Sequence, residues 1–316
     1  MNLLLIDTIH PVFSERMKEA GVQITDGFAL TEEEILKIIP SFEAIVLRSR
    51  IPVNEKLLNA ATNLRLIARA GAGMENIDVI AAQKRNIVCL NAPEGNRNAV
   101  AEHVLAMLLS LLNNIPSADA EVRNNIWKRE ANRGTELEGK TIAIIGFGNT
   151  GSTLASKLRS FNVRILALDK YVSIDKKFYP FITQVEWPDV FAHADIVSLH
   201  VPLTSETTNL ADDSFFNSFK KPIWFINTSR GKVASTSAIV KALKSGKISG
   251  AGLDVFDFED SSFEQVNLSS NPDFCYLRQS RNAILTPHIA GWTHESNYKI
   301  AAVLSNKIID WLRTNS

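Results

Sequence analysis

Six residues, GFGNTG at positions 146–151, constrain the fold of this 316-residue chain more than any other stretch. They follow the apolar run TIAII and precede a stretch of helical period. This placement predicts a strand, a tight turn and a helix, which together open a dinucleotide-binding βαβ unit. Gly146 would allow the turn, Gly148 the approach of a pyrophosphate, and Gly151 close packing of the helix. An α/β domain with an empty site is the alternative interpretation.

A carboxylate follows the next apolar run at the distance expected of a ribose-binding acid. That run ends at Asp169, and 169 − 151 gives 18 residues from the last glycine. Asp169 can accept hydrogen bonds from both ribose hydroxyls, whereas a 2′-phosphate would bring a like charge close to it. The pattern therefore favours NAD over NADP, although Lys170 beside Asp169 keeps NADP open as an alternative.

Short apolar runs alternate with helical stretches over nearly the whole chain, which predicts an α/β fold with parallel sheets. The expected strands cover residues 3–6, 44–47, 66–68 and 87–90 in a first series, and 141–146, 163–169, 195–200, 222–229, 248–255 and 282–288 in a second. We expect two Rossmann-like, doubly wound domains with a cleft between them. A substrate domain would comprise residues 1–96 and 288–316, and an NAD-binding domain residues 97–287.

Three helical patterns add detail to this prediction. Thr31 and Glu34 form a capping box at the start of a helix over residues 31–39. Residues 98–112 are apolar on almost every side, so this helix needs cover from its own domain, from a second subunit, or from both. Apolar residues recur at helical spacing over residues 300–312, which predicts an amphipathic C-terminal helix.

Composition excludes several classes of protein. Lys plus Arg and Asp plus Glu each number 34, so the net charge is zero and nucleic acid is not an expected partner. The longest apolar stretch is too short for a membrane span, and the N-terminus lacks a signal-peptide pattern, so we expect a cytoplasmic protein that does not bind membranes. Two distant cysteines, without metal-binding motifs, predict neither a disulfide framework nor a metal site.

Three polar residues lie at or just beyond the carboxyl ends of predicted strands of the second series, where ligands of open α/β sheets bind: Arg230, Glu259 and His288. Oxidation of a hydroxyacid needs a base of near-neutral pKa at the hydroxyl, which suits His288. Glu259 could orient that imidazole, and Arg230 could bind the substrate carboxylate. Each residue taken singly could equally be a surface or structural group.

Several ordered motifs resemble the D-isomer-specific 2-hydroxyacid dehydrogenase family. They are GFGNTG, HVPLT at 200–204, INTSRG at 226–231, GLDVF at 252–256 and TPHIAG at 286–291, together with ARAGAGMENID at 68–78 and NAPEGNRNAVAEH at 91–103. The resemblance covers nearly the whole chain. It places the family's Arg, Glu and His at Arg230, Glu259 and His288.

The resemblance also implies further site residues. Cofactor contacts would come from Gly146, Gly148, Asn149, Thr150, Gly151, Asp169, His200, Val201, Pro202, Thr207, Thr228, Asp254, Ala290 and Gly291. Substrate contacts would come from Arg48, Ser49, Asn96 and the backbone amides of Ala72 and Gly73. The resemblance further implies a homodimer through the helix at 98–112.

Within the family the chain most resembles D-3-phosphoglycerate dehydrogenases, and a cationic Arg48 would suit a phosphate. The expected reaction is NAD-dependent oxidation of D-3-phosphoglycerate to 3-phosphohydroxypyruvate, in a short form without a regulatory domain. Residues 260–281 carry an insertion, which leaves the substrate open. The alternatives are a glyoxylate or hydroxypyruvate reductase, another D-2-hydroxyacid dehydrogenase, or an NAD-sensing dimeric scaffold. Trp292 would either cover the site or anchor the last helix.

Overall fold

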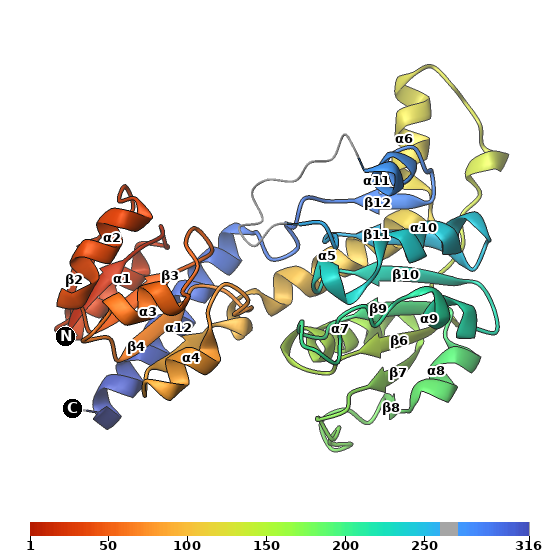
Figure 1. Ribbon diagram of the computed structural model, residues 1–316. Helices are drawn as coiled ribbons and strands as arrows, with labels where there is room; N and C mark the ends of the chain where they lie inside the picture. The colour runs from red at the N-terminus through yellow and green to blue at the C-terminus, as the bar shows by residue number, and fades with distance from the viewer. Residues whose placement is uncertain (260–270, 316) are drawn as a thin grey trace. The chain divides into compact units, whose positions relative to one another are not determined.

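The computed structural model describes residues 1–259 and 271–315, and its contacts divide these residues into two compact units (Figure 1). Unit 1 comprises Met1–Arg97 and residues 292–315, and unit 2 comprises Asn98–Glu259 and residues 271–291. Residues 288–291, which the sequence analysis assigned to the substrate domain, cluster with unit 2. The roles expected of the two domains remain predictions.

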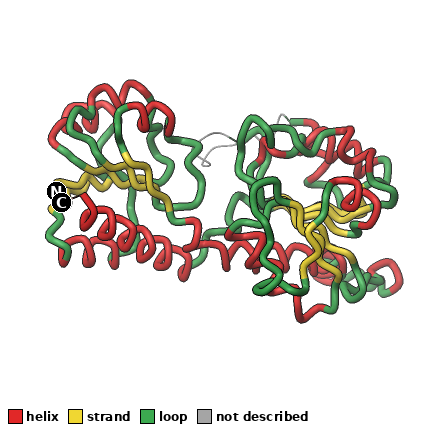
Figure 2. Tube along the Cα trace, turned by 90° about the horizontal axis from the view of Figure 1, so that it is seen from below, coloured by secondary structure: helices red, strands yellow, loops and turns green. Residues whose placement is uncertain are grey.

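Unit 1 is built on a parallel sheet whose described strands have the order β2-β1-β3-β4-β5. The strands are β1 (Asn2–Leu5), β2 (Gln23–Asp26), β3 (Ala44–Leu47), β4 (Leu66–Arg69) and β5 (Val88–Asn91). The helices are α1 (Val12–Glu19), α2 (Glu32–Ile38), α3 (Glu55–Ala60), α4 (Val79–Lys84) and α12 (His294–Asn315). They lie on both faces of the sheet (Figure 2).

The sequence of β1 explains why both faces of this sheet are covered. Leu3 and Leu5 pack in a cluster with residues of α1 and α12, while Leu4 packs in another cluster with residues of α2 and α3. All three leucines are almost completely buried. A strand that is apolar at consecutive positions needs helices on both sides, as in other parallel sheets.

Unit 2 contains a larger parallel sheet with the described strand order β12-β11-β10-β9-β6-β7-β8. The strands are β6 (Thr141–Ile145), β7 (Arg164–Leu168), β8 (Ile182–Gln184), β9 (Ile196–Leu199), β10 (Ile223–Asn227), β11 (Ile248–Leu253) and β12 (Ala283–Leu285). The helices are α5 (Pro93–Leu112, which begins in unit 1), α6 (Ile115–Arg123), α7 (Asn149–Leu158), α8 (Trp187–His193), α9 (Asp213–Ser218), α10 (Thr236–Lys244) and α11 (Pro272–Leu277).

Each sheet has one point where the strand order reverses. In unit 1 this switch point lies between β1 and β3, and in unit 2 between β6 and β9. Chains leaving two such strands diverge to opposite faces, which opens a crevice at their carboxyl ends where ligands of α/β sheets bind. Functional residues are therefore expected in the loops that follow these switch-point strands, which are β1, β3, β6 and β9.

The structure confirms the predicted α/β class with two parallel, doubly wound sheets. The capping box of Thr31 and Glu34 and the C-terminal helix are also confirmed. Two strands were missed, β2 and β8, and both lie at sheet edges. Edge strands bury less side-chain surface, so the polar sequences QITD and ITQ lack the apolar run by which strands were recognised.

The apolar helix α5 is covered mainly by its own chain. Val104, Met107, Leu108 and Leu111 are buried within the hydrophobic core of unit 2. Several exposed large apolar side chains lie instead on α6 and just after it: Ile115, Val122, Ile126 and Trp127. The sequence left open whether this helix is covered by its own domain, by a second subunit or by both. The structure shows that its own domain buries most of the apolar surface of α5.

No single helix of the described residues is long and apolar enough to cross a membrane, although α5 and α6, bent by 62° at their junction, reach the required length and composition together. The predicted insertion at 260–281 is described only in part. Residues 260–270 lie outside the described residues, and the remainder contains α11, whose N-terminus Asn271 caps.

Candidate active site

The glycine turn lies at the carboxyl end of β6, at the switch point of unit 2. Gly146 has a φ of +94°, and a Cβ there would lie 2.7 Å from the His200 carbonyl oxygen, so the turn requires glycine. A Cβ at Gly151 would overlap the Gly146 carbonyl oxygen, whereas one at Gly148 would meet no atom within 4 Å. The turn therefore packs tightly on its inner side and leaves room for a ligand at Gly148.

The N-terminus of α7 follows this turn and begins with Asn149, Thr150 and Gly151. Within the described part of the chain, no side chain caps it. The first N–H groups of a helix have no intrahelical partners, and the helix dipole makes this end attractive to anions. This helix end could therefore hold a pyrophosphate.

Asp169 ties the glycine turn to the end of β7. Its Oδ2 accepts a hydrogen bond from Phe147 N at 2.7 Å, and its Oδ1 accepts from Tyr171 N at 2.8 Å and Val172 N at 2.9 Å. A carboxylate has about four acceptor positions. Asp169 therefore keeps some capacity for a ribose hydroxyl while it fixes the turn.

Lys170 is paired with Glu206, which comes from the loop after β9. Lys170 Nζ lies 2.7 Å from Glu206 Oε1, and the Tyr171 hydroxyl donates to Glu206 Oε2 at 2.7 Å. The hydrogen bond with Lys170 lowers the pKa of Glu206, and the same bond raises the pKa of Lys170. Glu206 therefore neutralises the cation beside Asp169 that could otherwise attract a 2′-phosphate.

The segment after β9 starts with a neutral histidine. His200 Nε2 lies 2.9 Å from Ser198 Oγ, and burial lowers the pKa of His200 to about 4, so the ring carries no charge at pH 7. Val201 and Pro202 then lead into a turn that Thr207 stabilises, because its hydroxyl donates to the Pro202 carbonyl at 2.6 Å.

The loop after β10 carries Thr228 and Arg230 and is organised by Asn227. Asn227 Oδ1 accepts from Ser229 N at 3.1 Å and from Ser229 Oγ at 2.8 Å, while its Nδ2 donates to the Arg230 carbonyl at 3.2 Å. The Thr228 hydroxyl is buried and has no hydrogen-bond partner among the described residues. A buried hydroxyl without a partner is costly, which suits a position where a ligand completes the hydrogen bonding.

A close backbone contact holds the Arg230 loop against the segment that carries Glu259. A Cβ at Gly231 would overlap the Phe256 carbonyl oxygen, so only glycine permits this approach. Glu259 Oε1 accepts a hydrogen bond from Phe256 N, and its Oε2 lies 2.8 Å from His288 Nδ1. The carboxylate therefore fixes both the local turn and the histidine ring.

His288 has a φ of +56°, which is uncommon for a residue with a side chain. Its N–H donates to the Asp254 carbonyl at 2.8 Å. The buried Asp254 carboxylate holds the adjoining backbone, because it accepts from Thr286 Oγ1 at 2.5 Å and from Ile289 N and Ala290 N at 2.8 Å each. Asp254 thus fixes the loop on both sides of the histidine.

A second histidine joins this network from α5. His103 Nε2 lies 3.1 Å from Thr286 Oγ1 and 3.7 Å from Asp254 Oδ1. His103 ends the motif at 91–103, but no role for it was predicted. The available signal was its position at the start of the apolar part of α5.

In unit 1, Arg48 and Ser49 follow β3 at the switch point of the sheet. Asp7, directly after β1, accepts from Arg48 N at 2.5 Å and from Arg50 Nε at 3.1 Å. Arg50 also donates to the carbonyl oxygens of Ile6, Gly27 and Leu30. Arg50 therefore joins three loops, whereas the Arg48 guanidinium lies over the Trp292 ring, 4.6 Å from its centroid.

The predicted substrate loop lies beside these residues. The Asn76 amide donates to the Arg48 carbonyl at 3.0 Å, and the Asn91 amide donates to the Ala72 carbonyl at 2.6 Å. Gly73, next in the loop, is buried, and Asn96 is a half-buried residue of α5. Arg48, Ser49, Ala72, Gly73 and Asn96 all belong to unit 1.

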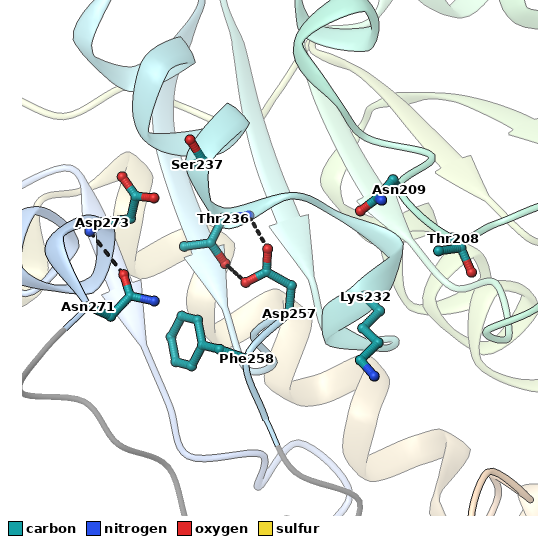
Figure 3. A pocket seen from close by; sticks show the side chains of 9 residues that line it. All are labelled: Thr208, Asn209, Lys232, Thr236, Ser237, Asp257, Phe258, Asn271 and Asp273. Atoms are coloured by element: carbon teal, nitrogen blue, oxygen red, sulfur yellow. Dashed lines mark hydrogen bonds between the residues drawn. The ribbon is translucent and has the colours of Figure 1, made fainter.

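A pocket in unit 2 has a volume of about 380 Å³, and Figure 3 shows the side chains that line it. Its lining residues are Thr208, Asn209, Lys232, Thr236, Ser237, Asp257, Phe258, Asn271 and Asp273. Asp257 accepts hydrogen bonds from Thr236 N at 3.0 Å and Thr236 Oγ1 at 2.6 Å. The pocket contains no residue of the predicted site, although Phe258 immediately precedes Glu259.

The structure thus brings the predicted residues together in groups. Glu259 and His288 are in direct contact, and Asp254 holds the backbone around His288. The glycine turn, Asp169 and the segment after β9 surround the switch point of unit 2 and fit a dinucleotide, since Gly148 is open and the Thr228 hydroxyl lacks a partner. Within the described residues there is no group of three or more metal-ligating side chains that could hold an ion.

Comparison with known proteins agrees with this geometry. Residues 105–290, more than half of the chain, match the NAD-binding domain model of the D-isomer specific 2-hydroxyacid dehydrogenases. Among curated proteins, D-3-phosphoglycerate dehydrogenase of Synechocystis is 37% identical over 98% of this chain and 54% of its own length. The corresponding enzyme of Archaeoglobus fulgidus is 33% identical over 98% of this chain and 57% of its own length.

The chain therefore spans somewhat more than half the length of these curated relatives. Among solved structures, D-lactate dehydrogenase from Aquifex aeolicus, complexed with NAD and lactic acid, aligns with a TM-score of 0.83 and 28% identity, covering 99% of this chain and 96% of that one. The chain belongs to the D-isomer specific 2-hydroxyacid dehydrogenase family, and residues 105–290 form its NAD-binding domain.

Proposed function

We propose that this protein is an NAD-dependent oxidoreductase that interconverts a D-2-hydroxyacid and its 2-keto acid. The observation that carries the proposal is the His288–Glu259 pair, with 2.8 Å between Nδ1 and Oε2, in a chain that contains the family's NAD-binding domain. Such a pair provides a positioned proton donor and acceptor within the cofactor domain itself.

His288 would act as the general acid and base. With Nδ1–H directed to Glu259, the imidazole holds one tautomer and uses Nε2 to take the hydroxyl proton during oxidation. The Glu259 carboxylate favours the imidazolium that forms, because opposite charges attract strongly at this distance. The nicotinamide, when bound, accepts or supplies the hydride.

Arg230 and unit 1 would bind the acid itself. A guanidinium can hold the carboxylate of the substrate and polarise the keto oxygen during reduction. The backbone amides of Ala72 and Gly73 are proposed to bind the same carboxylate. Unit 2 would thus supply the proton and cofactor chemistry, while unit 1 supplies groups that select the acid.

D-3-phosphoglycerate is the substrate we propose, with 3-phosphohydroxypyruvate as its product. Arg48 carries a positive charge at the switch point of unit 1, and arginine is well suited to bind a phosphate. The similarity to curated D-3-phosphoglycerate dehydrogenases supports this choice. Glyoxylate or hydroxypyruvate reduction is the second candidate, since it needs the same chemistry without the phosphate.

The test is NADH oxidation by the purified protein with phosphohydroxypyruvate, hydroxypyruvate, glyoxylate and pyruvate. We expect the highest kcat/KM for phosphohydroxypyruvate. A higher value for hydroxypyruvate or glyoxylate would favour the second candidate. Binding of NADH without turnover of any acid would contradict the enzymatic proposal and favour an NAD-sensing scaffold.

We also propose a cytoplasmic homodimer. The exposed apolar side chains of α6 and the segment after it, of which Trp127 is 78% exposed, offer a better surface for a second copy than the buried α5. Light scattering checks this proposal against the chain mass of 35.0 kDa. A dimer would have twice that mass, and a monomer at micromolar concentration would contradict it.

A further inference from the structure

The Arg48–Trp292 pair contains a cation whose hydrogen-bonding groups have no partner among the residues that the structure describes. In the described chain, the guanidinium of Arg48 makes no hydrogen bond or ion pair, while its carbon lies 4.6 Å from the centroid of the Trp292 ring. Burial lowers the pKa of Arg48, and the charge of nearby Asp7 opposes this effect only in part. A partly desolvated guanidinium without acceptors is costly unless a ligand supplies them.

The neighbouring arginine shows that the chain can satisfy a guanidinium at this place. Arg50 donates to the Asp7 carboxylate and to three backbone carbonyl oxygens. The Asp7 carboxylate also accepts the backbone N–H of Arg48, at 2.5 Å. The Asp7 carboxylate therefore holds the backbone of Arg48, but it forms its ion pair with the side chain of Arg50.

The backbone of Arg48 is held rigidly at the switch point of the sheet. Its N–H is bound by Asp7, and its carbonyl accepts from Asn76 Nδ2 at 3.0 Å and Arg69 Nε at 3.3 Å. Ligands of sheets with this strand order bind at the carboxyl ends of the two strands where the order reverses. Arg48 therefore occupies the ligand position of the unit 1 sheet.

Trp292 is 68% exposed, so only a small part of the indole can pack against the last helix. Large aromatic side chains are more often covered, so an exposed indole beside a guanidinium indicates a recognition surface. A guanidinium that stacks on an indole does so with its flat face. Its in-plane N–H groups then stay available to bind two oxygens of one anion.

We propose that Trp292 is a specificity-determining residue that holds the Arg48 guanidinium in the orientation needed to bind a second anionic group of the substrate. The ligand class is a 2-hydroxyacid or 2-keto acid with a phosphate on its neighbouring carbon. This inference rests on the proposed function but concerns a residue for which that proposal has no role. An indole whose ring centroid lies 4.6 Å from the guanidinium carbon would shield part of the cation from water, and this shielding would strengthen the attraction of the cation to the phosphate.

The experiment compares binding and turnover of phosphohydroxypyruvate and hydroxypyruvate by the full chain with Trp292→Ala and Trp292→Phe. For Trp292→Ala we expect the preference for the phosphorylated acid, as a ratio of Kd values from calorimetry and of kcat/KM values, to fall by about tenfold. The Trp292→Phe variant should lose less, since phenyl rings bind cations more weakly than indole. Combining Arg48→Ala with Trp292→Ala should lower the preference no further than Arg48→Ala alone.

The chain offers a matched control in its Arg65–Trp311 pair, where the guanidinium lies 5.4 Å from the ring centroid and also donates to the Asn315 carbonyl. Trp311→Phe should keep the preference for the phosphorylated acid. Equal losses for both acids in Trp292→Ala, or a retained preference, would overturn the inference. If no acid is turned over but the Kd ratio still depends on Trp292, the proposed reaction fails and the inference stands.

Discussion

The two switch points of this protein share a topology but differ in the chemistry of their loops. In unit 2, the loop after β6 is a glycine turn that leads into the N-terminus of α7. In unit 1, the loop after β3 presents the Arg48 guanidinium beside an indole. Both attract anions, one with backbone dipoles and one with a formal charge. The difference shows that the order of strands determines where a ligand can bind, whereas the loop residues determine which kind of ligand binds there.

Carboxylates just past the ends of strands stabilise the loops in both units. Asp7 holds the Arg48 backbone in unit 1, and Asp254 holds the backbone around His288 in unit 2. Each aspartate lies just past the carboxyl end of a strand and accepts N–H groups that no strand can satisfy. We therefore expect the two residues to affect different steps, substrate binding for Asp7 and proton transfer for Asp254.

Among the variants that distinguish the roles of the two units, Asp254→Asn is expected to have the largest effect on stability and on kcat. The new amide group would face a backbone N–H, so one buried donor loses its acceptor and the free energy of unfolding falls by about 1–3 kcal/mol. Because the His288 loop shifts, kcat should fall by about 10–100-fold. Steady-state kinetics and urea unfolding check both values.

Asp7→Asn is the matched variant for unit 1. It should raise the KM for the acid by more than it lowers kcat, because the Arg48 backbone loses its anchor while the His288–Glu259 pair stays intact. An equal fall of kcat in both variants would show that the two carboxylates do not have separate tasks.

Acid should destabilise unit 2 through His200. Its pKa is lowered by burial from 6.5 to about 4, so above pH 6.5 it is neutral in both states and has no effect. Between pH 6.5 and 4 the unfolded chain binds a proton that the folded chain excludes, and the free energy of unfolding falls as the pH falls. At pH 5 the loss amounts to about 2 kcal/mol.

Urea unfolding of the wild type and of His200→Gln at pH 7 and pH 5 measures this loss. The variant should be less sensitive to acid, and hydrogen exchange should show the difference in β9 and not in β3. An identical acid sensitivity of both proteins would refute the assignment to His200.

The smallest effect concerns the choice between NADH and NADPH. Glu206→Gln removes the ion pair of Lys170 beside Asp169, so the preference for NADH, as a ratio of kcat/KM values, should fall by about two- to fivefold, since exposed ion pairs are weak. The control is Glu130→Gln, which removes the exposed pair with Arg133 elsewhere on unit 2. An unaltered preference in Glu206→Gln would show that Asp169 discriminates alone.

Most of the fold could be predicted because it depends on local apolar runs and glycine turns. The buried central strands were found, while the edge strands β2 and β8 were missed, since their sequences are mainly polar. Glycine positions were informative because Gly146 requires a turn that other residues avoid. These features belong to short segments, so they can be read from one stretch of sequence.

The contacts that assemble the site could not be predicted in the same way. His103 and Asp254 are 151 positions apart, as 254 − 103 shows, and Glu206 meets Lys170 across two loops. The pattern of apolar and polar residues along the chain does not indicate such pairs, because the order of strands in the sheet brings them together. The exposed apolar residues of α6 and the segment after it were likewise not predicted, because they stand among polar residues and form no continuous apolar run like that of α5.

The central claim is that the His288–Glu259 pair performs the proton transfer. Its most direct test is kcat for NADH oxidation with the best acid of the substrate panel, comparing wild type and His288→Ala, with His294→Ala as an exposed histidine control. We predict a loss of about 10²–10⁴-fold for His288→Ala, unaltered NADH binding, and a control close to wild type. A His288→Ala variant that keeps more than about a tenth of the wild-type kcat would contradict the account.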